Sequence, residues 1–477
     1  MGYVPTIGLE VHVQLNTKSK LFSTASCGFG GEPNSQTTAV CLGLPGALPV
    51  LNKEAVRKAV KAALALSGTI NPKSRFDRKN YFYPDLPKGY QISQYFEPFC
   101  TGAKIEIDTP NGRKVIGISR IHLEEDAGKL LHSENPAIAE SYVDFNRAGT
   151  PLIEIVSKPE MDSPDEAVAY LTKLKSIMEY IEVSDCDMEK GSLRVDANVS
   201  LRREGEVRLG TRVEIKNLNS FKALKAAIEY EIERQREILE SGGSVVQETR
   251  LFNPTLGKTI GMRTKEEAHD YRYFPDPDLV PLILSEEEIE SWRQELPELA
   301  EQKKERFIKE FSLPEYDAQV LTAQKAVADY FEAVVKAGAP AKKASNWVMV
   351  EMLALTQKGH LSVWDLFPPE YLAQLIQEIE KGNISGKIGK TVFELMVTEK
   401  KNPREIIQER NLAQISDTEY IGKIIDEVLL ENPSAVADFK SGKERALKHL
   451  QGEIMKKSKG RVNPVLTNEI LLKKLQG

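Results

Sequence analysis

One stretch near the middle of the chain constrains the fold more than any other. From Leu193 to Ser200 (LRVDANVS) apolar and polar residues alternate strictly, and a period of two predicts a β-strand. One side can pack on a core, while the other carries Arg194, Asp196 and Asn198 at successive two-residue steps. A half-exposed antiparallel strand with a hydrated polar face also explains one such pattern taken alone.

The same pattern recurs in four other segments, and each brings an acid near its middle or end. These segments are 7–15 (IGLEVHVQL), 116–126 (IGISRIHLEED), 152–156 (LIEIV) and 213–217 (VEIKN). Carboxylates gathered on one sheet face repel one another and lose hydration, so they need a counter-charge. Oxygen ligands with a single histidine favour Mg²⁺ or Mn²⁺ over zinc. The five strands therefore predict a sheet face that binds a divalent cation, an ion that commonly holds phosphate oxygens.

Length and charge add an outline of the domains. A chain of 477 residues exceeds a single core, so two to four domains are expected. From Ser441 to Gly477 there are nine Lys or Arg and three acids, although the whole chain has a net charge of −6. A basic tail on an acidic body favours contact with a polyanion, and a solvated helical surface is the alternative.

Cysteine usage and hydropathy indicate the compartment. The four cysteines form no CxxC pair, which is typical of a reducing environment. No apolar run reaches membrane length and no signal peptide opens the chain. We therefore expect a cytoplasmic protein with no membrane partner.

An aromatic and basic segment, residues 76–94 (FDRKNYFYPDLPKGYQISQ), follows a predicted helix that has Asn52 as its N-cap. Aromatic faces can stack a base while nearby cations contact phosphate, a combination found at single-stranded nucleic-acid ends and nucleotides. A loop held by buried tyrosines is the alternative.

These segments together resemble the B subunit family of the tRNA-dependent amidotransferases, which amidate misacylated Glu-tRNA(Gln) or Asp-tRNA(Asn). The resemblance runs in order through nearly the whole chain. The motifs that carry it are IGLEVHVQL, FDRKNYFYPDLPKGYQISQ, RIHLEEDAGK, DFNRAGTPLIEIV, MEKGSLRVDANVS, EIKNLNSF and HDYRYFPDPDLVPL.

The resemblance implies an α+β fold in three parts. An antiparallel β cradle similar to glutamine synthetase would span 1–292, a helical domain 293–405, and a small helical tail domain 406–477. The tail's basic stretch Gly452 to Pro464 (GEIMKKSKGRVNP) would contact the tRNA body. Many family members carry a four-cysteine zinc knuckle after the first strand, whereas this chain has Ser23, Ala25, Thr38 and only Cys41 there. We expect no zinc, because tetrahedral thiolate binding needs all its ligands.

The implied reaction is that of a carbon–nitrogen ligase with glutamine as nitrogen donor. ATP would phosphorylate the side-chain carboxylate of the tRNA-bound amino acid, and ammonia would then displace phosphate, with Mg²⁺ offsetting charge. No GxxxxGK[ST] is present, so no P-loop is expected. The candidate catalytic residues are Glu10, His12, Glu125, Arg194, Asp196 and Lys216. The candidate ATP-binding residues are Lys79, Tyr81, Tyr83, Arg194, Asn198, Ser200 and Lys216. The candidate metal ligands are Glu10, His12, Glu124, Glu125, Glu154, Glu189, Asp196 and Glu214.

Two details qualify these assignments. Adjacent Glu124 and Glu125 cannot both point inward from a regular strand. One of them should therefore hold the ligands in place without being a ligand itself, unless a β-bulge turns it to the same face. Asp276 and Asp278 could add ligands, although acids beside prolines are more often turn formers.

The chain shows no Cys–His nucleophile context and no serine-rich amidase signature, so ammonia must come from elsewhere. The resemblance supplies the partners: an amidase, known as the A subunit, together with a small C subunit in a heterotrimer, and misacylated tRNA bound at its acceptor end and by the basic tail. No DNA partner is expected. Two alternatives stay open: a non-catalytic tRNA-binding scaffold, and a stand-alone ligase acting on free amino acids.

Overall fold

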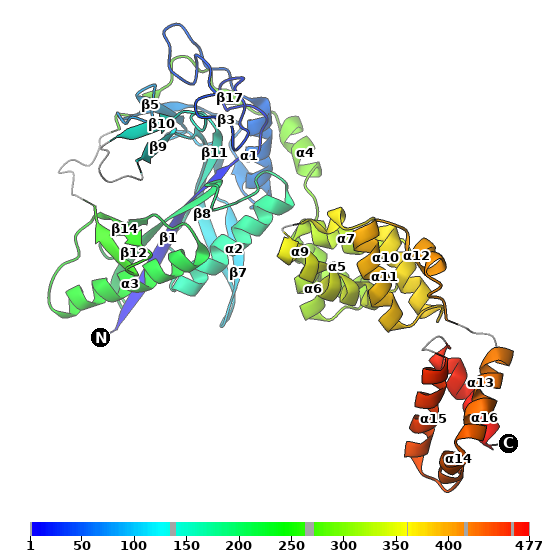
Figure 1. Ribbon diagram of the computed structural model, residues 1–477. Coiled ribbons are helices and arrows are strands. Elements are labelled where there is room, and N and C mark those ends of the chain that lie inside the picture. The colour runs from blue at the N-terminus through cyan, green and yellow to red at the C-terminus, as the bar shows by residue number, and fades with distance from the viewer. Residues whose placement is uncertain are drawn as a thin grey trace. The chain divides into compact units, whose positions relative to one another are not determined.

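The computed structural model describes residues 2–133, 140–262, 271–359, 361–414, 418–458 and 462–476. The chain divides into two compact units, Met1–Leu299 and Ala300–Gly477. The first unit combines a large sheet with helices and the second is helical, so the fold is α+β as predicted (Figure 1). The further division near residue 405 stays a prediction.

The first unit is organised around a ten-stranded sheet with the order β15-β14-β13-β12-β1-β11-β8-β6-β2, to which β7 is added by pairing with β8. Its strands are β1 (Tyr3–Gln14), β2 (Thr69–Ile70), β6 (Cys100–Thr101), β7 (Lys104–Thr109), β8 (Gly112–Glu125), β11 (Pro151–Ser157), β12 (Leu193–Arg203), β13 (Val213–Lys216), β14 (Thr249–Asn253) and β15 (Lys258–Gly261). The five predicted strands are confirmed, and they are neighbours at the centre of this sheet.

The expectation of a wholly antiparallel sheet is wrong at one pair. Strands β13 and β14 run parallel, whereas the other paired strands of the sheet are antiparallel. The reason lies in the connection, because helix α3 (Phe221–Glu240) intervenes between these two strands. A helical crossover returns the chain in the same direction.

Smaller strand pairs flank the large sheet. They are formed by β3 (Lys73–Ser74) with β17 (Leu282–Ile283), β4 (Asp77–Asn80) with β5 (Tyr90–Ser93) and β16 (Phe274–Pro275), and β9 (Lys129–His132) with β10 (Ser141–Asp144). The motif HDYRYFPDPDLVPL (residues 269–282) contributes to two of these pairs, while His269 and Asp270 lie outside the described residues.

Helices cover the apolar face of the large sheet (Figure 1). Inward residues such as Ile7, Val11 and Val199 are fully buried and share one core with α1 (Lys53–Ala65), α2 (Pro164–Tyr180) and α3. The predicted Asn52 cap is confirmed, because its side chain accepts from Glu54 N and Ala55 N. Ser163 likewise caps α2, ahead of Pro164. Helix α4 (Glu286–Gln294) begins after a serine cap, Ser285. With one face covered, the polar side chains of the central strands are left on the other.

The second unit contains helices only in its described residues. They are α5 (Ala300–Phe311), α6 (Glu315–Thr322), α7 (Lys325–Lys336), α8 (Ala341–Asn346), η1 (Trp347–Met352), α9 (Leu353–Gly359), η2 (Val363–Asp365), α10 (Pro369–Glu380), α11 (Gly386–Glu399), α12 (Pro403–Glu409), α13 (Thr418–Glu431), α14 (Pro433–Lys440), α15 (Glu444–Lys457) and α16 (Pro464–Gln476). One hydrophobic core joins buried residues between Phe307 and Ile407, and a second joins residues from Ile421 to Leu475. Among the described residues of the whole chain, no helix has both the length and the apolar composition needed to cross a membrane.

Candidate functional site

Strand register brings the predicted polar residues into one row. His12 on β1 pairs with Glu154 on β11 and with Arg194 on β12, and Glu154 in turn pairs with His122 on β8. Directly paired residues point to the same side of a sheet. Four neighbouring strands therefore place charged or ionisable side chains side by side on the face that the helices leave open.

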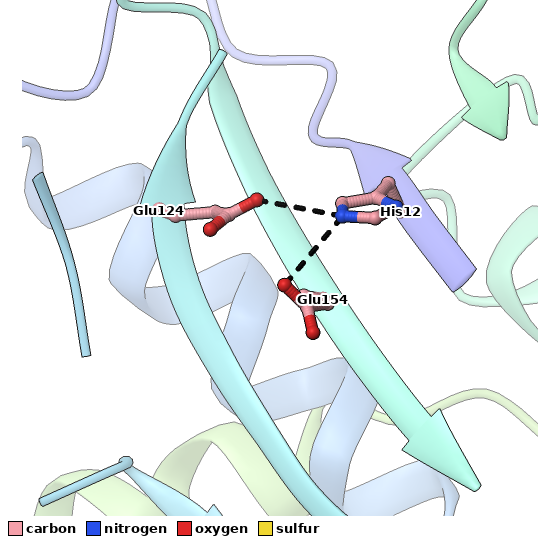
Figure 2. Close-up of side chains that lie close together, drawn as sticks. All are labelled: His12, Glu124 and Glu154. Carbon is pink, nitrogen blue, oxygen red and sulfur yellow. Dashed lines mark ion pairs between the residues drawn. The ribbon is translucent and has the colours of Figure 1, made fainter. Parts of the chain in front are cut away.

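The centre of the row is a compact cluster of His12, Glu124 and Glu154 (Figure 2). Nε2 of His12 lies 3.6 Å from Oε1 of Glu124 and 3.5 Å from Oε2 of Glu154. Figure 2 shows both carboxylates directed toward the imidazole from two neighbouring strands. All three side chains belong to the predicted metal-ligand set.

His122 is a fourth member of the cluster that the sequence interpretation missed. It is buried, and its Nε2 lies 3.6 Å from Oε2 of Glu124 and 3.3 Å from Oε2 of Glu154. The period-two rule contained the necessary signal, because residues 122 and 124 of one strand share a face.

The two carboxylates control the protonation of both imidazoles. Burial opposes the charged form of His122, but the charges of Glu154 and Glu124 and the contacts with them raise its pKa to about 9. The pKa of His12 is raised as well, by Glu154 and Glu124 against the effect of burial. Burial alone would raise the pKa of Glu154, but His122 and His12 hold it well below its ordinary value. Without a metal, protons on the imidazoles balance these acids.

The same donors fit a divalent cation. One ligand atom from each of His12, Glu124 and Glu154 lies within 4.8 Å of the others. An octahedral ion with bonds of about 2.1 Å places adjacent ligand atoms about 3 Å apart, so only a small contraction is needed. Two carboxylate oxygens with one nitrogen suit Mg²⁺ or Mn²⁺.

A second group lies on the next positions of β1, β12 and β13. Nδ2 of Asn198 donates to Oε1 of Glu10 at 3.0 Å, and Nζ of Lys216 lies 2.7 Å from Oδ2 of Asp196 and 3.2 Å from Oε1 of Glu214. Burial, together with the charges of Glu154 and Glu214, raises the pKa of Glu10. Burial would lower the pKa of Lys216, but the charges of Asp196 and Glu214 raise it overall. The predicted residues of this group are thus brought together, with Lys216 as their cation.

Arg194 connects the row to a third group. Its Nη1 donates to Oδ2 of buried Asp126 at 3.0 Å, the same oxygen that accepts from Gln14 at 2.8 Å. Nε of Arg147 lies 3.6 Å from this oxygen. Burial would raise the pKa of Asp126, but Arg194 and Arg147 lower it. Two guanidinium groups are therefore held beside one carboxylate, which leaves an excess of positive charge.

These guanidinium groups face a cavity of about 750 Å³ at the Gln14 end of the polar face. Its cationic lining residues are Lys129, Arg147, Lys190, Arg194 and Lys216, and its acidic ones are Asp144, Glu189 and Asp196. The glycine-rich loop 28–31 forms part of the wall. A concave surface with more cations than acids next to a cation-binding cluster is suited to phosphate groups.

Glu125 points away from the cluster, so only one of the two adjacent glutamates faces inward. Its carboxylate forms an ion pair with Lys88 and accepts a hydrogen bond from Ile92 N at 3.0 Å, whereas Oε2 of Glu124 accepts from Ser93 Oγ at 3.2 Å. In its described position Glu125 is not a ligand of the cluster. The alternation of the strand accounts for this difference.

The remaining predicted residues are spread more widely. Exposed Glu189 lines the large cavity in the loop before β12, away from the cluster. The ammonium group of Lys79 lies 4.8 Å from the ring centre of Tyr271, which also packs on Tyr81. Tyr83 is 52% exposed in a loop, so it is not brought to the cluster.

Tyr81 remains close to the acids. Burial and the charges of Asp85 and Glu124 raise the pKa of its hydroxyl. Asp276 and Asp278, considered as additional ligands, instead bind Arg78 at 2.9 and 2.7 Å. Their partner lies about two hundred residues earlier, which local sequence patterns do not reveal.

The place of the zinc knuckle is filled by hydrogen bonds. Oγ of Ser23 and Oγ1 of Thr38 lie 3.2 and 3.4 Å from Sγ of buried Cys41. Burial raises the pKa of the thiol, but these hydroxyls and the nearby Lys20 lower it overall. One thiol, two hydroxyls and an alanine do not fit a structural zinc ion.

The fold and this face define an α+β protein with a candidate divalent-cation site beside a cationic cavity. Two family models match the chain: the GatB/GatE catalytic domain over residues 5–290 and the GatB domain over residues 329–475. The first covers more than half of the chain, and the chain belongs to this family, as the motifs predicted.

Full-length relatives agree with this membership. The B subunit of the aspartyl/glutamyl-tRNA(Asn/Gln) amidotransferase of Geotalea daltonii is 56% identical over 479 residues, covering all of both chains. The relative from Thermoanaerobacter pseudethanolicus, which has the same name, is 54% identical over 476 residues and also covers both chains completely. The chain is thus similar to amidotransferase B subunits over its whole length.

Proposed function

We propose that this chain is the B subunit of a tRNA-dependent amidotransferase, and that its sheet face carries out ATP-dependent amidation of misacylated Glu-tRNA(Gln), Asp-tRNA(Asn) or both. The observation that supports this most is the in-register row of His122, Glu154, His12 and Arg194 across four strands, beside a cavity rich in cations. Such a face costs folding stability unless a cation and an anionic ligand compensate it.

The reaction begins with activation of a carboxylate, because oxide is too poor a leaving group for direct attack by ammonia. A side-chain carboxylate oxygen of the tRNA-bound amino acid bonds to the γ-phosphorus of ATP. The bond from that phosphorus to the β–γ bridging oxygen breaks, which gives ADP and an acyl phosphate. Ammonia then bonds to the acyl carbon, inorganic phosphate leaves with the C–O electron pair, and the nitrogen loses a proton.

The chain's own residues have distinct roles in this proposal. His12, Glu124 and Glu154 would hold Mg²⁺ or Mn²⁺, which supplies charge compensation for the phosphates when bound. Arg194 and Lys216 contact phosphate oxygens from the wall of the cavity. Glu10, whose pKa is raised by burial and by Glu154 and Glu214, is suited to accept the proton that the attacking nitrogen loses.

The source of ammonia lies outside this chain. We propose that a separate amidase, the A subunit, hydrolyses glutamine to release ammonia, and that a small C subunit is the third member of a heterotrimer. A cytoplasmic location, where tRNA and ATP are available, is part of the same proposal.

The tail provides a second contact with tRNA in this proposal. On α15 and α16, Lys457 pairs with Glu427 and Glu431, and Lys474 pairs with Asp426. Arg445, Lys448 and Lys473 have no carboxylate at ion-pair distance among the described residues of the chain. These three cations remain available for phosphate groups, while Lys459 and Arg461 of the predicted basic stretch lie outside the described residues.

The test is ATP hydrolysis by the purified complex with and without misacylated tRNA. We expect hydrolysis to depend on that tRNA and on Mg²⁺, and to be lost in Glu154→Ala. A scaffold role predicts that Glu154→Ala and Asp196→Ala leave ATP cleavage and amidation unchanged. A ligase for free amino acids predicts turnover without tRNA.

A further inference from the structure

A cluster of two thiols and one amine lies in the loop that follows β1, apart from the cation cluster. It contains Cys27, Cys41 and Lys20, which lie close enough for the charge of each to affect the ionisation of the others. Cys41 is 6% exposed, whereas Cys27 is half-buried and lines the large cationic cavity. The proposed reaction uses none of these groups, and they do not fit a structural zinc ion.

The sulfur of Cys41 is surrounded by groups that stabilise a negative charge. Oγ of Ser23 lies 3.2 Å from it and Oγ1 of Thr38 lies 3.4 Å from it, and both hydroxyls can donate to a thiolate. The backbone of Thr38 also forms a hydrogen bond with it. A sulfur atom that accepts several hydrogen bonds holds a negative charge more readily than a free thiol does.

The counter-charge is a buried ammonium group. Lys20 is 1% exposed, and its Nζ donates to the carbonyl oxygen of Phe145 at 3.3 Å. Among the described residues no carboxylate lies at ion-pair distance from Lys20. The charge of Glu125 reaches it, but this carboxylate is paired with Lys88. A buried cation needs an anion beside it, and the Cys41 thiolate is placed to supply one.

The other three thiols of the chain lack this environment. Burial raises the pKa of Cys27, and it raises those of Cys100 and Cys186 to about 12. Burial opposes ionisation of Cys41 as well, but the surrounding hydroxyls and the lysine outweigh it, so the pKa of this thiol is lowered. The thiolate is the form that reacts with peroxides. One thiol of the four is therefore activated.

We propose that Cys41 is a site of reversible oxidation by hydrogen peroxide, with Lys20 as the proton donor. The Cys41 thiolate attacks one peroxide oxygen, so that an S–O bond forms and the O–O bond breaks. The leaving hydroxide takes a proton from the Lys20 ammonium group, which gives water, a sulfenic acid and a neutral amine. Both charges of the pair disappear together, so oxidation leaves no unpaired charge in the cluster.

Access and reversal fit this chemistry. Hydrogen peroxide is little larger than water, and the half-buried hydroxyls of Ser23 and Thr38 provide a polar approach to the sulfur. A small thiol then attacks the sulfenic sulfur and releases water, which leaves a mixed disulfide. A second thiol breaks this disulfide and restores the Cys41 thiol.

The first test compares the four thiols within the full chain. The native protein is treated with hydrogen peroxide, and catalase stops the reaction. Unfolding in dimedone then labels each sulfenic acid for peptide mapping by mass spectrometry. We expect Cys41 to be oxidised about tenfold faster than any other thiol. Cys27 is the internal control, because it is more exposed. Faster oxidation of Cys27 would mean that exposure alone decides, and the proposal would be wrong.

The second test changes the neighbours of the sulfur. Thr38→Val should slow the oxidation of Cys41 a few-fold, whereas Thr38→Ser, which keeps a hydroxyl, should retain the wild-type rate. Lys20→Met should slow it about tenfold at pH 7 and shift the midpoint of its pH profile upward. A variant that only loosens the fold would expose the thiol and accelerate its oxidation, so a slower rate is not a sign of misfolding.

The outcomes are distinguishable. Equal rates of Cys41 oxidation in wild type, Thr38→Val and Lys20→Met would overturn the proposal, and so would an oxidised product that dithiothreitol does not reduce. These measurements need neither ATP nor tRNA. Their failure would therefore leave the proposed function untouched, and a lack of tRNA-dependent ATP hydrolysis would leave the oxidation site untouched.

Discussion

The sheet face of the first unit and the terminal helices of the second use charge in opposite ways. On the sheet, His122, Glu124 and Glu154 are largely buried, and Nε2 of His122 lies 3.6 Å from Glu124 and 3.3 Å from Glu154. On the terminal helices, pairs such as Lys457 with Glu431 are solvent-exposed. Buried charge is expensive and exposed charge is nearly neutral for stability. We therefore expect catalysis at the sheet face and salt-dependent electrostatic binding at the terminal helices.

The largest effect is expected from Glu154, which contacts both imidazoles. Glu154→Ala removes a ligand and leaves buried His122 and half-buried His12 without their main counter-charge, so amidation should fall about 1000-fold. The measurement is kcat for tRNA-dependent ATP hydrolysis and for amidation. Glu106→Gln, at an exposed position of β7, is the control and should retain full activity. Near-normal activity of Glu154→Ala would mean that the buried charges of the sheet face do not serve the chemistry, and the contrast with the terminal helices would be lost.

Substitution of Arg194 allows its contribution to stability and its contribution to catalysis to be measured separately. Arg194→Met removes a partner of buried Asp126, so the protein should lose about 3 kcal/mol of unfolding free energy. Amidation should fall about 100-fold, because a phosphate-binding guanidinium is lost. Denaturant unfolding and steady-state kinetics measure the two effects.

The double variant Arg194→Met/Asp126→Asn provides the matching control. It removes the carboxylate charge that Arg147 alone would otherwise have to balance, so it should recover part of the stability without recovering activity. Recovery of both would mean that Arg194 serves folding alone.

Without a metal, protons on the imidazoles are expected to balance the charges of Glu124 and Glu154. The pH dependence of the unfolding free energy of the metal-free first unit tests this expectation. The pKa of His122 is raised from its unfolded value of about 6.5 to about 9. A raised pKa contributes stability that is fully present below pH 6.5 and is lost as the pH rises through about 9. The loss should reach up to about 3 kcal/mol.

Unfolding in EDTA between pH 6 and pH 10 measures this loss. His122→Gln should reduce the slope, and the remainder should come from His12, whose pKa is also raised. Cation binding displaces the same protons, so the apparent affinity for Mn²⁺ should increase over this range. An affinity for Mn²⁺ that does not change with pH would contradict the assigned protonation.

The smallest effect is expected on the terminal helices. Neutralising Lys448 and Lys473 together should leave the unfolding temperature unchanged and raise the KM for misacylated tRNA a few-fold, with a shallower salt dependence. Titrations at several salt concentrations measure this. Neutralising Lys457, which is already paired with Glu427 and Glu431, should have less effect on tRNA binding. An equal effect of both changes would mean that pairing does not determine which lysines are used.

Sequence patterns predicted the central strands and the Asn52 cap of the first helix because period and cap chemistry are local. They also grouped His12, Glu124 and Glu154 correctly as residues of one face. They did not identify His122, although the same two-residue period places residues 122 and 124 on one face of the strand. The pairing of Lys88 with Glu125, and of Arg78 with Asp276, depends on contacts between distant segments. The parallel β13–β14 pair likewise follows from where α3 returns the chain, which no local pattern contains.

The most direct test follows oxygen atoms. Misacylated tRNA with ¹⁸O in the side-chain carboxylate of its amino acid is amidated by the purified complex, and the released phosphate is analysed by mass spectrometry. Phosphorylation of the carboxylate at the sheet face predicts one ¹⁸O in each phosphate formed, and loss of this transfer in Glu154→Ala. Phosphate without ¹⁸O during normal amidation would contradict the account.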